Sequence, residues 1–296
     1  MLCHGTRIDE KNVMLLLLVF LLQLAVPHDQ LLELGNAATL RKQPAAANEI
    51  KIVSYNIRWR GGEELKRVAK LLHDDPEIGG ASILCLQEVD RKKKRTANRN
   101  TVKTLADELG FHYAWAAPPT AKPDDEEETG VAILSVYPLA DVKRIVLPNP
   151  GPGKRRRVAL GATIEVDGRK WRVYSAHAET RIAVDKKLEQ YNAILQDLAT
   201  YPSDMPAIVM GDFNTWQPNA DDKTIKLFKN AGLNTPFGGQ STFCRTVLLV
   251  PIKLRLDWVW LRGLEAVQHG VDQQIDISDH WPLWTILKAP VAVTKK

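Results

Sequence analysis

The segment Met210–Trp216, with the sequence MGDFNTW, ends an apolar run in an acid, an aromatic residue and an amide. Asp212 and Asn214 stand two positions apart, and neighbours at this spacing on an extended chain project from the same face. A buried strand would not otherwise end by directing a carboxylate and an amide to one side. The pattern predicts that this pair meets a polar ligand.

Other apolar segments also begin or end in polar residues that a core would not select. These residues, in the motifs SYN, LQE, SAH, DWVW and DHWP, are Asn56, Glu88, His177, Asp257, Asp279 and His280. In open α/β sheets, ligands gather where strand ends and loops converge. Carboxylates and histidines brought together would repel or stay unsatisfied unless their charge were neutralised. Mg²⁺, which prefers oxygen ligands and keeps several waters, is a simple solution.

Taken singly, each of these residues has a plainer interpretation. An Asn that ends a strand is usually a turn residue, and an Asp that precedes a strand is usually solvated. A lone His is more often a packing residue than a catalyst. The joint occurrence at comparable positions therefore favours a functional site.

The motifs SYNIRW, LQEVD, GDFNT, LDWVW and SDHWP follow one another along the chain. In this order, from about Ile50 to Leu287, the sequence resembles the endonuclease/exonuclease/phosphatase superfamily, which includes deoxyribonucleases and neutral sphingomyelinases. GDFN and SDHxP are highly specific in combination. The resemblance implies an α/β fold, a four-layer α/β/β/α sandwich with two mixed β-sheets like that of deoxyribonuclease I. It also implies phosphoester hydrolysis with Mg²⁺, or Mn²⁺ in its place, as cofactor.

The resemblance implies a role for each matching residue. Glu88 would be the principal metal carboxylate, with Asn56 and Asp279 as further ligands of the metal or its water. Asp212 would orient or deprotonate the attacking water. Asn214 would hold the scissile phosphate or the nucleophile.

Two histidines complete the implied catalytic set. His280 would donate a hydrogen bond to the phosphoryl oxygens, and Asp257 would orient its ring. His177, in YSAHAE, matches a candidate general acid, although Ser175 and Ala178 replace the usual Asn and Leu around it. An arginine of KRRRVAL, either Arg156 or Arg157, would contact phosphate, and the sequence leaves open which of them does so.

These residues need a scaffold of alternating strands and helices. Helical spacing occurs in EELKRVAKLL, NTVKTLADELG, DKKLEQYNAILQDLA and DKTIKLFKNAG, and strand-like runs in IKIVSYNIRW, ASILCLQEV, TGVAILSV, RVALGATIEV, KWRVYSAHA, MPAIVMGDFN, LDWVWL and PLWTIL. Gly110 is expected to end the second helix. Asp167 and Gly168 predict a tight hairpin. Alternation of this kind, together with hairpins, predicts layered α/β architecture with mixed sheets.

The amino terminus carries a nearly pure apolar run, Val13–Val26. Its length suits the core of a signal peptide better than a spanning helix. We predict a signal peptide or membrane anchor at residues 1–26, a linker at 27–48, the main domain at 49–290 and a tail at 291–296. The protein would then be secreted, periplasmic or membrane-anchored on the extracytoplasmic side. A buried core helix is the alternative for this run.

Composition excludes several classes of protein. The chain has 296 residues, of which 45% are hydrophobic, and this excludes a disordered or fibrous chain. Three cysteines cannot build a disulfide framework, and no Cys/His cluster suggests zinc. The net charge of +5 is mildly favourable for a polyanionic partner.

The substrate stays open between two classes of phosphoester. The basic runs RKKKR and KRRR favour nucleic acid, whereas Trp216, Trp281, Trp284 and the amino-terminal apolar run favour a phospholipid or inositol headgroup. The rival function is a non-catalytic, membrane-tethered binding module on the same scaffold. Loss of the metal carboxylate or a catalytic histidine would favour it, and the sequence keeps both. The sequence does not indicate an oligomeric state.

Overall fold

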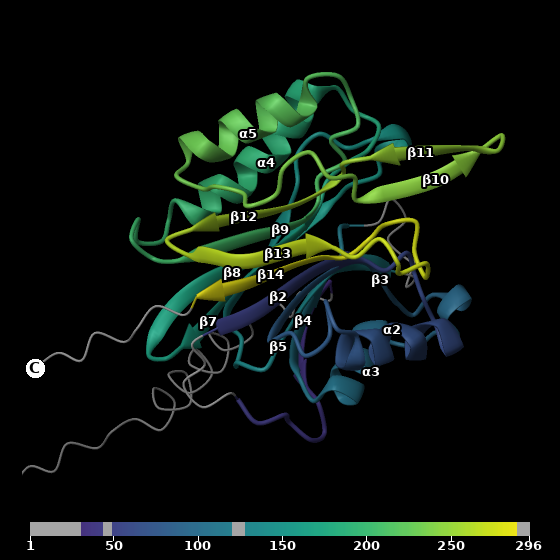
Figure 1. The fold of residues 1–296 in the computed structure, drawn as a ribbon, viewed down its shortest axis with the longest axis vertical. Helices are drawn as coiled ribbons and strands as arrows, with labels where there is room; N and C mark the ends of the chain where they lie inside the picture. The colour runs from purple at the N-terminus through teal and green to yellow at the C-terminus, as the bar shows by residue number, and fades with distance from the viewer. Residues whose placement is uncertain (1–30, 44–48, 120–127, 289–296) are drawn as a thin grey trace, which may run out of the picture. The chain divides into compact units, whose positions relative to one another are not determined.

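The polar motifs lie at the ends of strands in two stacked sheets of a computed structural model that describes residues 31–43, 49–119 and 128–288 (Figure 1). Among these residues, a seven-stranded sheet has the order β1-β4-β5-β3-β2-β14-β13, a five-stranded sheet has the order β12-β9-β8-β7-β6, and β10 and β11 form a separate hairpin. Two neighbouring pairs, β2 with β3 and β8 with β9, are parallel, and the other pairs are antiparallel. Both large sheets are therefore mixed.

The strands are β1 (Leu32–Asn36), β2 (Glu49–Asn56), β3 (Ile83–Arg91), β4 (His112–Ala116), β5 (Glu128–Ser135), β6 (Ala140–Val146), β7 (Val158–Val166), β8 (Arg169–His177), β9 (Ala207–Asp212), β10 (Phe243–Val247), β11 (Val250–Leu254), β12 (Asp257–Arg262), β13 (Glu265–Val271) and β14 (Leu283–Lys288). The helices are α2 (Gly62–Asp74), α3 (Thr101–Leu109), α4 (Val184–Leu198) and α5 (Ala220–Asn230), with short 3-10 turns at Lys94–Thr96 and Pro152–Lys154.

The two large sheets pack face to face through their apolar residues. One continuous core cluster includes Ile52 and Leu84 of the first sheet together with Val173 and Met210 of the second. Polar groups also join the sheets, since Ser175 Oγ of β8 donates to the Leu86 carbonyl of β3 at 3.2 Å. The packing of β3 against β8 brings the Glu88 and His177 ends of two different sheets to one side of the molecule.

Helices cover the outer face of each sheet, which gives the four layers α/β/β/α (Figure 1). On the five-stranded sheet, Tyr191 of α4 and Phe228 of α5 pack against β9 and β12 in a second apolar cluster. Phe228 stacks on Trp260 with ring centroids 4.5 Å apart. This arrangement confirms the sandwich expected from the sequence.

The strongest local signals are confirmed. The four helical patterns correspond to α2, α3, α4 and α5, and the eight strand-like runs all contain strands. Gly110 ends α3 in the left-handed conformation with φ 72°, which a residue without Cβ adopts freely. Asp167 and Gly168 both have positive φ and join β7 to β8 in the predicted hairpin.

The predicted linker at residues 27–48 is wrong for part of its length. Leu32–Asn36 form β1, which pairs antiparallel with β4 from Leu32 opposite Ala116 to Asn36 opposite His112. The compact unit that contains the described residues begins at Leu31. An edge strand of five residues with half-exposed side chains carries little apolar periodicity, so the pattern did not indicate it.

The apolar run Val13–Val26 and the tail 291–296 lie outside the described residues. Within residues 31–43, 49–119 and 128–288, no helix has the length and apolar character needed to cross a membrane.

Candidate active site

Strand register places the sequence-predicted residues at one end of the two sheets. His177 is the last residue of β8, and its partner in the parallel strand β9 is Asp212. Asp212 in turn lies opposite Asp257, the first residue of the antiparallel strand β12. Asn56 ends β2 in the other sheet, and its Nδ2 donates to Asp212 Oδ2 at 3.1 Å. Parallel neighbours end at the same edge, which is why distant motifs meet here.

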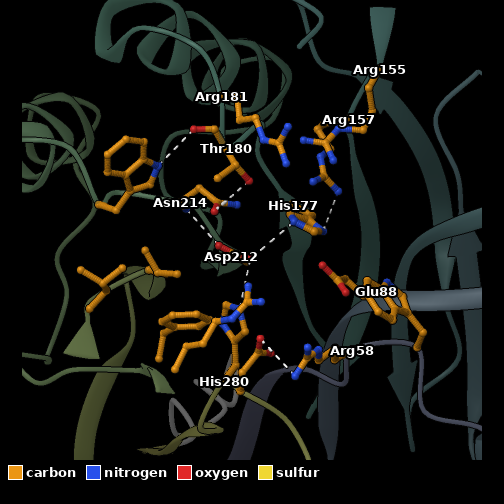
Figure 2. A pocket seen from close by; sticks show the side chains of 17 residues that line it. Arg58, Glu88, Arg155, Arg157, His177, Thr180, Arg181, Asp212, Asn214 and His280 are labelled. Carbon is orange, nitrogen blue, oxygen red and sulfur yellow. Dashed lines mark hydrogen bonds and ion pairs between the residues drawn. The ribbon is translucent and has the colours of Figure 1, made fainter. Parts of the chain in front are cut away.

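These residues line or underlie a cleft of about 450 Å³ (Figure 2). Its lining residues are Arg58, Trp59, Glu88, Arg155, Arg157, His177, Thr180, Arg181, Asp212, Asn214, Trp216, Phe243, Arg245, Leu254, Leu256, Asp279 and His280. Five of them are arginines, so the cleft is suited to an anion.

Asp212 is the centre of the hydrogen-bond network on the cleft floor. Besides the bond from Asn56, its Oδ1 accepts the Asn214 backbone N–H at 3.0 Å, and His177 Nε2 lies 3.4 Å from Oδ2. Burial raises the pKa of Asp212, and this is opposed by His280 and reinforced by Asp257. A carboxylate with a raised pKa and fixed orientation is suited to accept a proton.

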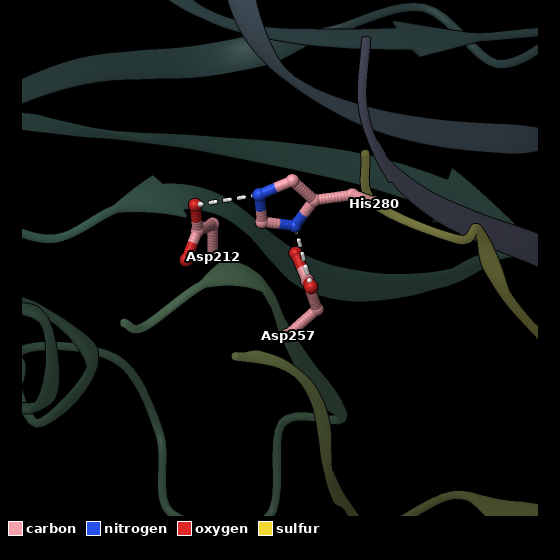
Figure 3. A group of neighbouring side chains, drawn as sticks. All are labelled: Asp212, Asp257 and His280. Carbon is pink, nitrogen blue, oxygen red and sulfur yellow. Dashed lines mark hydrogen bonds and ion pairs between the residues drawn. The ribbon is translucent and has the colours of Figure 1, made fainter. Parts of the chain in front are cut away.

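His280 lies between two carboxylates (Figure 3). Its Nδ1 is 2.8 Å from Asp257 Oδ2, and its Nε2 is 3.8 Å from Asp212 Oδ2. Thr242 Oγ1 donates to the same Asp257 oxygen at 2.7 Å, which fixes that carboxylate behind the ring. Burial opposes the charged ring, but Asp257 and Asp212 outweigh it and raise the pKa of His280. His280 is therefore an imidazolium that can donate through Nε2.

His177 has the opposite protonation. Burial lowers its pKa well below the ordinary value, and the charges of Arg157 and His280 lower it further. Arg157 Nη1 lies 3.3 Å from His177 Nδ1. Because a guanidinium only donates, Nδ1 must accept, and the neutral ring carries its proton on Nε2, which faces Asp212. Ala178, in place of the larger residue usual there, is itself buried.

Asn214 adopts a left-handed backbone with φ 53° directly after the strand. Its Nδ2 donates to the Ala178 carbonyl at 3.1 Å, and its Oδ1 accepts the Thr180 hydroxyl at 3.1 Å. The buried Lys187 Nζ donates to the Asn214 carbonyl at 2.5 Å. The amide therefore positions the neighbouring loop and keeps one N–H for a ligand in the cleft.

The oxygen donors predicted to hold a metal, Glu88, Asn56 and Asp279, lie in or beneath the same cleft. Glu88 occupies a bulge where β3 shifts register against β5, with φ 56°, and its carboxylate lines the cleft. Burial raises the pKa of Glu88, although Arg157 and His280 counteract this. No ion pair joins Glu88 to another described residue. Asp279 pairs with Arg58 at 3.3 Å and also lines the cleft.

The donor chemistry of these three residues fits a hard cation. Glu88, Asn56 and Asp279 offer oxygen ligands, and the half-buried carboxylate of Glu88, which has no ion-pair partner among the described residues, would be stabilised by a cation. The Asn56 Oδ1 also accepts the Arg58 backbone N–H at 3.1 Å. A second group, Asp212, Asp257 and His280, has ligand atoms within 4.8 Å of one another. Its shortest contact is the His280–Asp257 hydrogen bond, which a metal on these atoms would break. The first set is therefore the better candidate.

The sequence predicted only part of the arginine wall, the side of the cleft formed by Arg155 and Arg157. Arg157 lines the cleft, whereas Arg156 is exposed and lies outside its lining residues. Sequence reasoning missed Arg155, whose Nε donates to Glu179 Oε2 at 3.0 Å. Glu179 is fully buried and also accepts from Arg157, at 3.4 Å. A glutamate two residues after the SAH motif was the available signal for this anchor. Further missed lining residues are Arg58, Arg181 and Arg245.

Comparison with known proteins agrees with this geometry. The model of the Endonuclease/Exonuclease/phosphatase family matches residues 53–280. A UPF0294 protein of Vibrio vulnificus is 34% identical over 125 residues, which are 42% of this chain and 42% of the relative. The chain thus matches less than half the length of the curated relatives found.

Solved structures share the fold. An endonuclease/exonuclease/phosphatase from Beutenbergia cavernae has a TM-score of 0.64 and 19% identity, covering 83% of this chain and 74% of that one. A conserved protein of unknown function from Enterococcus faecalis has a TM-score of 0.63 and 21% identity, covering 81% and 100%. D. rerio TDP2, complexed with single-strand DNA product, has a TM-score of 0.61 and 15% identity, covering 82% and 100%.

Proposed function

Because the chain belongs to the endonuclease/exonuclease/phosphatase family, we propose that it is a Mg²⁺-dependent hydrolase that cleaves phosphodiesters by attack of water on phosphorus. The supporting observation is the cleft that brings a base, two histidines of opposite protonation, oxygen donors and arginines together. Phosphoryl transfer depends mostly on positioning and on neutralising the phosphoryl oxygens, and these groups supply both.

Each residue has a physical task in this proposal. Glu88, Asn56 and Asp279 would hold Mg²⁺ or Mn²⁺, which polarises the phosphoryl group when bound. Asp212, with its raised pKa, orients the water and accepts its proton. The Nε2–H of His280 stabilises the charge that develops on the phosphoryl oxygens.

The arginine wall and His177 act on the remaining groups of the substrate. Arg157 is held against His177 and Glu179, so its guanidinium is fixed before an anion arrives. The neutral His177 carries its one proton on Nε2, which suits it to donate a hydrogen bond to the leaving oxygen. The leaving oxygen takes its proton from solvent, His177 keeps its own, and Asp212 releases to solvent the proton that it accepted from the attacking water.

Replacement of Glu88 by Gln tests the proposal. Hydrolysis of bis-p-nitrophenyl phosphate should require added Mg²⁺ or Mn²⁺ in the wild type, and should fall ~10²–10³-fold in Glu88→Gln because the metal carboxylate is lost. Calorimetry should show Mg²⁺ binding to the wild type and much weaker binding to the variant. Glu63→Gln changes an exposed carboxylate on α2 and serves as the control.

Full activity in Glu88→Gln would contradict the assignment. Failure of the wild type to bind either cation would instead favour the non-catalytic, membrane-tethered binding module. The extracytoplasmic location and the membrane association of residues 13–26 are part of the proposal, and amino-terminal sequencing of exported protein checks whether that segment is removed.

A further inference from the structure

The hairpin formed by β10 and β11 carries the most exposed large apolar side chains of the described residues. Leu248 is 93% exposed, Leu249 is 95% exposed and the adjoining Val250 is 61% exposed. Figure 1 shows this hairpin extending away from both large sheets. Single exposed apolar residues are ordinary, but a contiguous apolar tip on a projecting element indicates an interaction site.

The backbone conformation at the tip of the hairpin is unfavourable for leucine. Val247 pairs with Val250, so Leu248 and Leu249 are the two residues of a tight loop. Both have positive φ, 47° and 67°. A two-residue loop with two positive φ values favours Asn and Gly, because a bulky side chain is strained there. The chain thus accepts local strain and water-exposed apolar surface at the same two positions.

The apolar surface continues from the tip to the cleft. In the register Val247–Val250, Arg245–Ile252 and Phe243–Leu254, all six side chains lie on one face of the hairpin. Phe243, Arg245 and Leu254 are also lining residues of the cleft. The hairpin base is tied to the catalytic segment, since the Cys244 N–H donates to the Asp279 carbonyl at 2.9 Å. A surface bound at the tip would therefore lie beside the catalytic cleft.

The charge of the hairpin indicates what kind of partner surface it binds. Residues 243–254 contain Arg245 and Lys253 and no Asp or Glu. An aliphatic tip followed by basic residues matches a bilayer interface, with acyl chains below and anionic headgroups above. A single-stranded nucleic acid would instead be bound by stacking on a series of aromatic rings. Residues 243–254 contain one aromatic residue, Phe243, and its ring packs edge-on against His280.

We propose that the β10–β11 hairpin inserts Leu248 and Leu249 into a lipid bilayer and so holds the cleft over phospholipid headgroups. Membrane docking by the hairpin stands independently, whereas the choice of a phospholipid as the phosphoester substrate rests on the proposed hydrolase function. The face that connects tip and cleft would guide the apolar part of such a substrate.

A fluorophore at the tip tests docking in the full chain without any reference to catalysis. An environment-sensitive dye is attached through Leu249→Cys in a Cys3→Ser/Cys244→Ser background, where the remaining Cys85 is buried. Vesicles of phosphatidylcholine with phosphatidylserine should raise and blue-shift its emission several-fold, and brominated lipids should quench it. The same dye at Leu34→Cys on β1, 52% exposed, should not respond.

The control position also removes the effect of the amino-terminal apolar run, because that run is present in both labelled proteins. Equal responses at the two positions would overturn the proposal. A response of the tip to protein concentration without vesicles would overturn it in favour of self-association. A response to DNA without vesicles would overturn it in favour of nucleic acid.

A turn-compatible variant separates docking from hydrolysis. Leu248→Asn/Leu249→Gly supplies the residues that the loop geometry favours, so the hairpin should fold at least as well. Hydrolysis of vesicle phospholipids should fall about tenfold or more, since the variant loses the two leucines that would insert into the bilayer, while hydrolysis of bis-p-nitrophenyl phosphate stays unchanged. Leu34→Asn/Leu40→Asn should leave both rates unchanged.

The two proposals can fail separately. If the tip docks but vesicle lipids are not cleaved while the soluble diester is, the substrate half of the inference is wrong and the hydrolase function stands. If Glu88→Gln still gives the tip response but cleaves neither substrate, docking and the hydrolase function are both supported. An unchanged rate on vesicles in Leu248→Asn/Leu249→Gly overturns the docking role.

Discussion

The cleft floor and the β10–β11 hairpin use polar and apolar groups in opposite ways. On the floor, Asp212, Asp257 and His280 are buried, and each is held by hydrogen bonds from elements far apart in the sequence. On the hairpin, Leu248 and Leu249 are almost fully exposed and strained. Both arrangements are unfavourable for folding alone.

This contrast indicates what kind of partner each region contacts. The floor is pre-organised, because its orientations are set by the protein before a substrate arrives, and such groups act on the transition state. The exposed region completes its contacts only with something outside the chain. Substitutions on the floor should therefore change kcat or stability. Substitutions at the rim, by which we mean exposed lining residues such as Arg181 together with the hairpin, should change KM or membrane binding.

Asp257→Asn tests the floor and should have the largest effect. The amide can present a donor to His280 Nδ1, which disfavours the imidazolium that now donates through Nε2. We expect kcat to fall ~10²–10³-fold with KM little changed. Steady-state kinetics on the soluble diester measures this, with the exposed Asp276→Asn as control.

Metal binding decides how the floor works. Calorimetric binding of Mg²⁺ should be unchanged in Asp257→Asn, because the proposed ligands are Glu88, Asn56 and Asp279. Loss of Mg²⁺ binding together with kcat would show that the cluster of Asp212, Asp257 and His280 is itself the metal site.

Lys187→Met tests the support beneath the floor. Burial lowers the pKa of Lys187 to about 8 from 10.5, although Asp212 and Glu179 act in the other direction. Below the lower value both folded and unfolded states are protonated. Between the two values the folded state has lost the proton and the unfolded state keeps it, so stability rises with pH.

The difference in the free energy of unfolding between the wild type and Lys187→Met isolates the contribution of Lys187. The free energy of unfolding of the wild type, relative to that of Lys187→Met, should rise by roughly 1–3 kcal/mol as the pH increases through this window. Chemical denaturation at a series of pH values measures it. Lys186→Met, a substitution of an exposed neighbour on α4, should show no such rise. A flat difference for Lys187→Met would mean that its ammonium is solvated.

The same contrast explains how far sequence reasoning reached. The motifs GDFN and SDHWP allow the residues of the cleft floor to be predicted, because their polar residues interrupt strong apolar periodicity. The structure brings Asp212, Asp257 and His280 together. The short strands β1 and β10 were missed because few of their side chains are buried. Their position is decided by pairing across the sheet or across a turn, which local periodicity does not encode.

The arginine wall lies between these cases. The sequence did not indicate which of the three consecutive arginines, Arg155 to Arg157, faces the cleft. Their orientation depends on the buried Glu179, which the loop after β8 carries. The carboxylate pairs with the first and third of them, and the second lies outside the lining of the cleft. Only the assembled structure supplies that partner.

Arg181→Gln tests the rim and should have the smallest effect. The guanidinium lines the cleft, and no hydrogen bond or ion pair joins it to another described residue. Its ordering on an anionic substrate should contribute little beyond a solvent-exposed charge pair, so we expect KM to rise ~2–5-fold with kcat unchanged. The rise should shrink as salt screens the charge. Arg156→Gln, a substitution of an exposed arginine outside the cleft lining, should leave KM unchanged. A fall in kcat for Arg181→Gln would place this arginine with the pre-organised floor, and the division between floor and rim would then not follow burial.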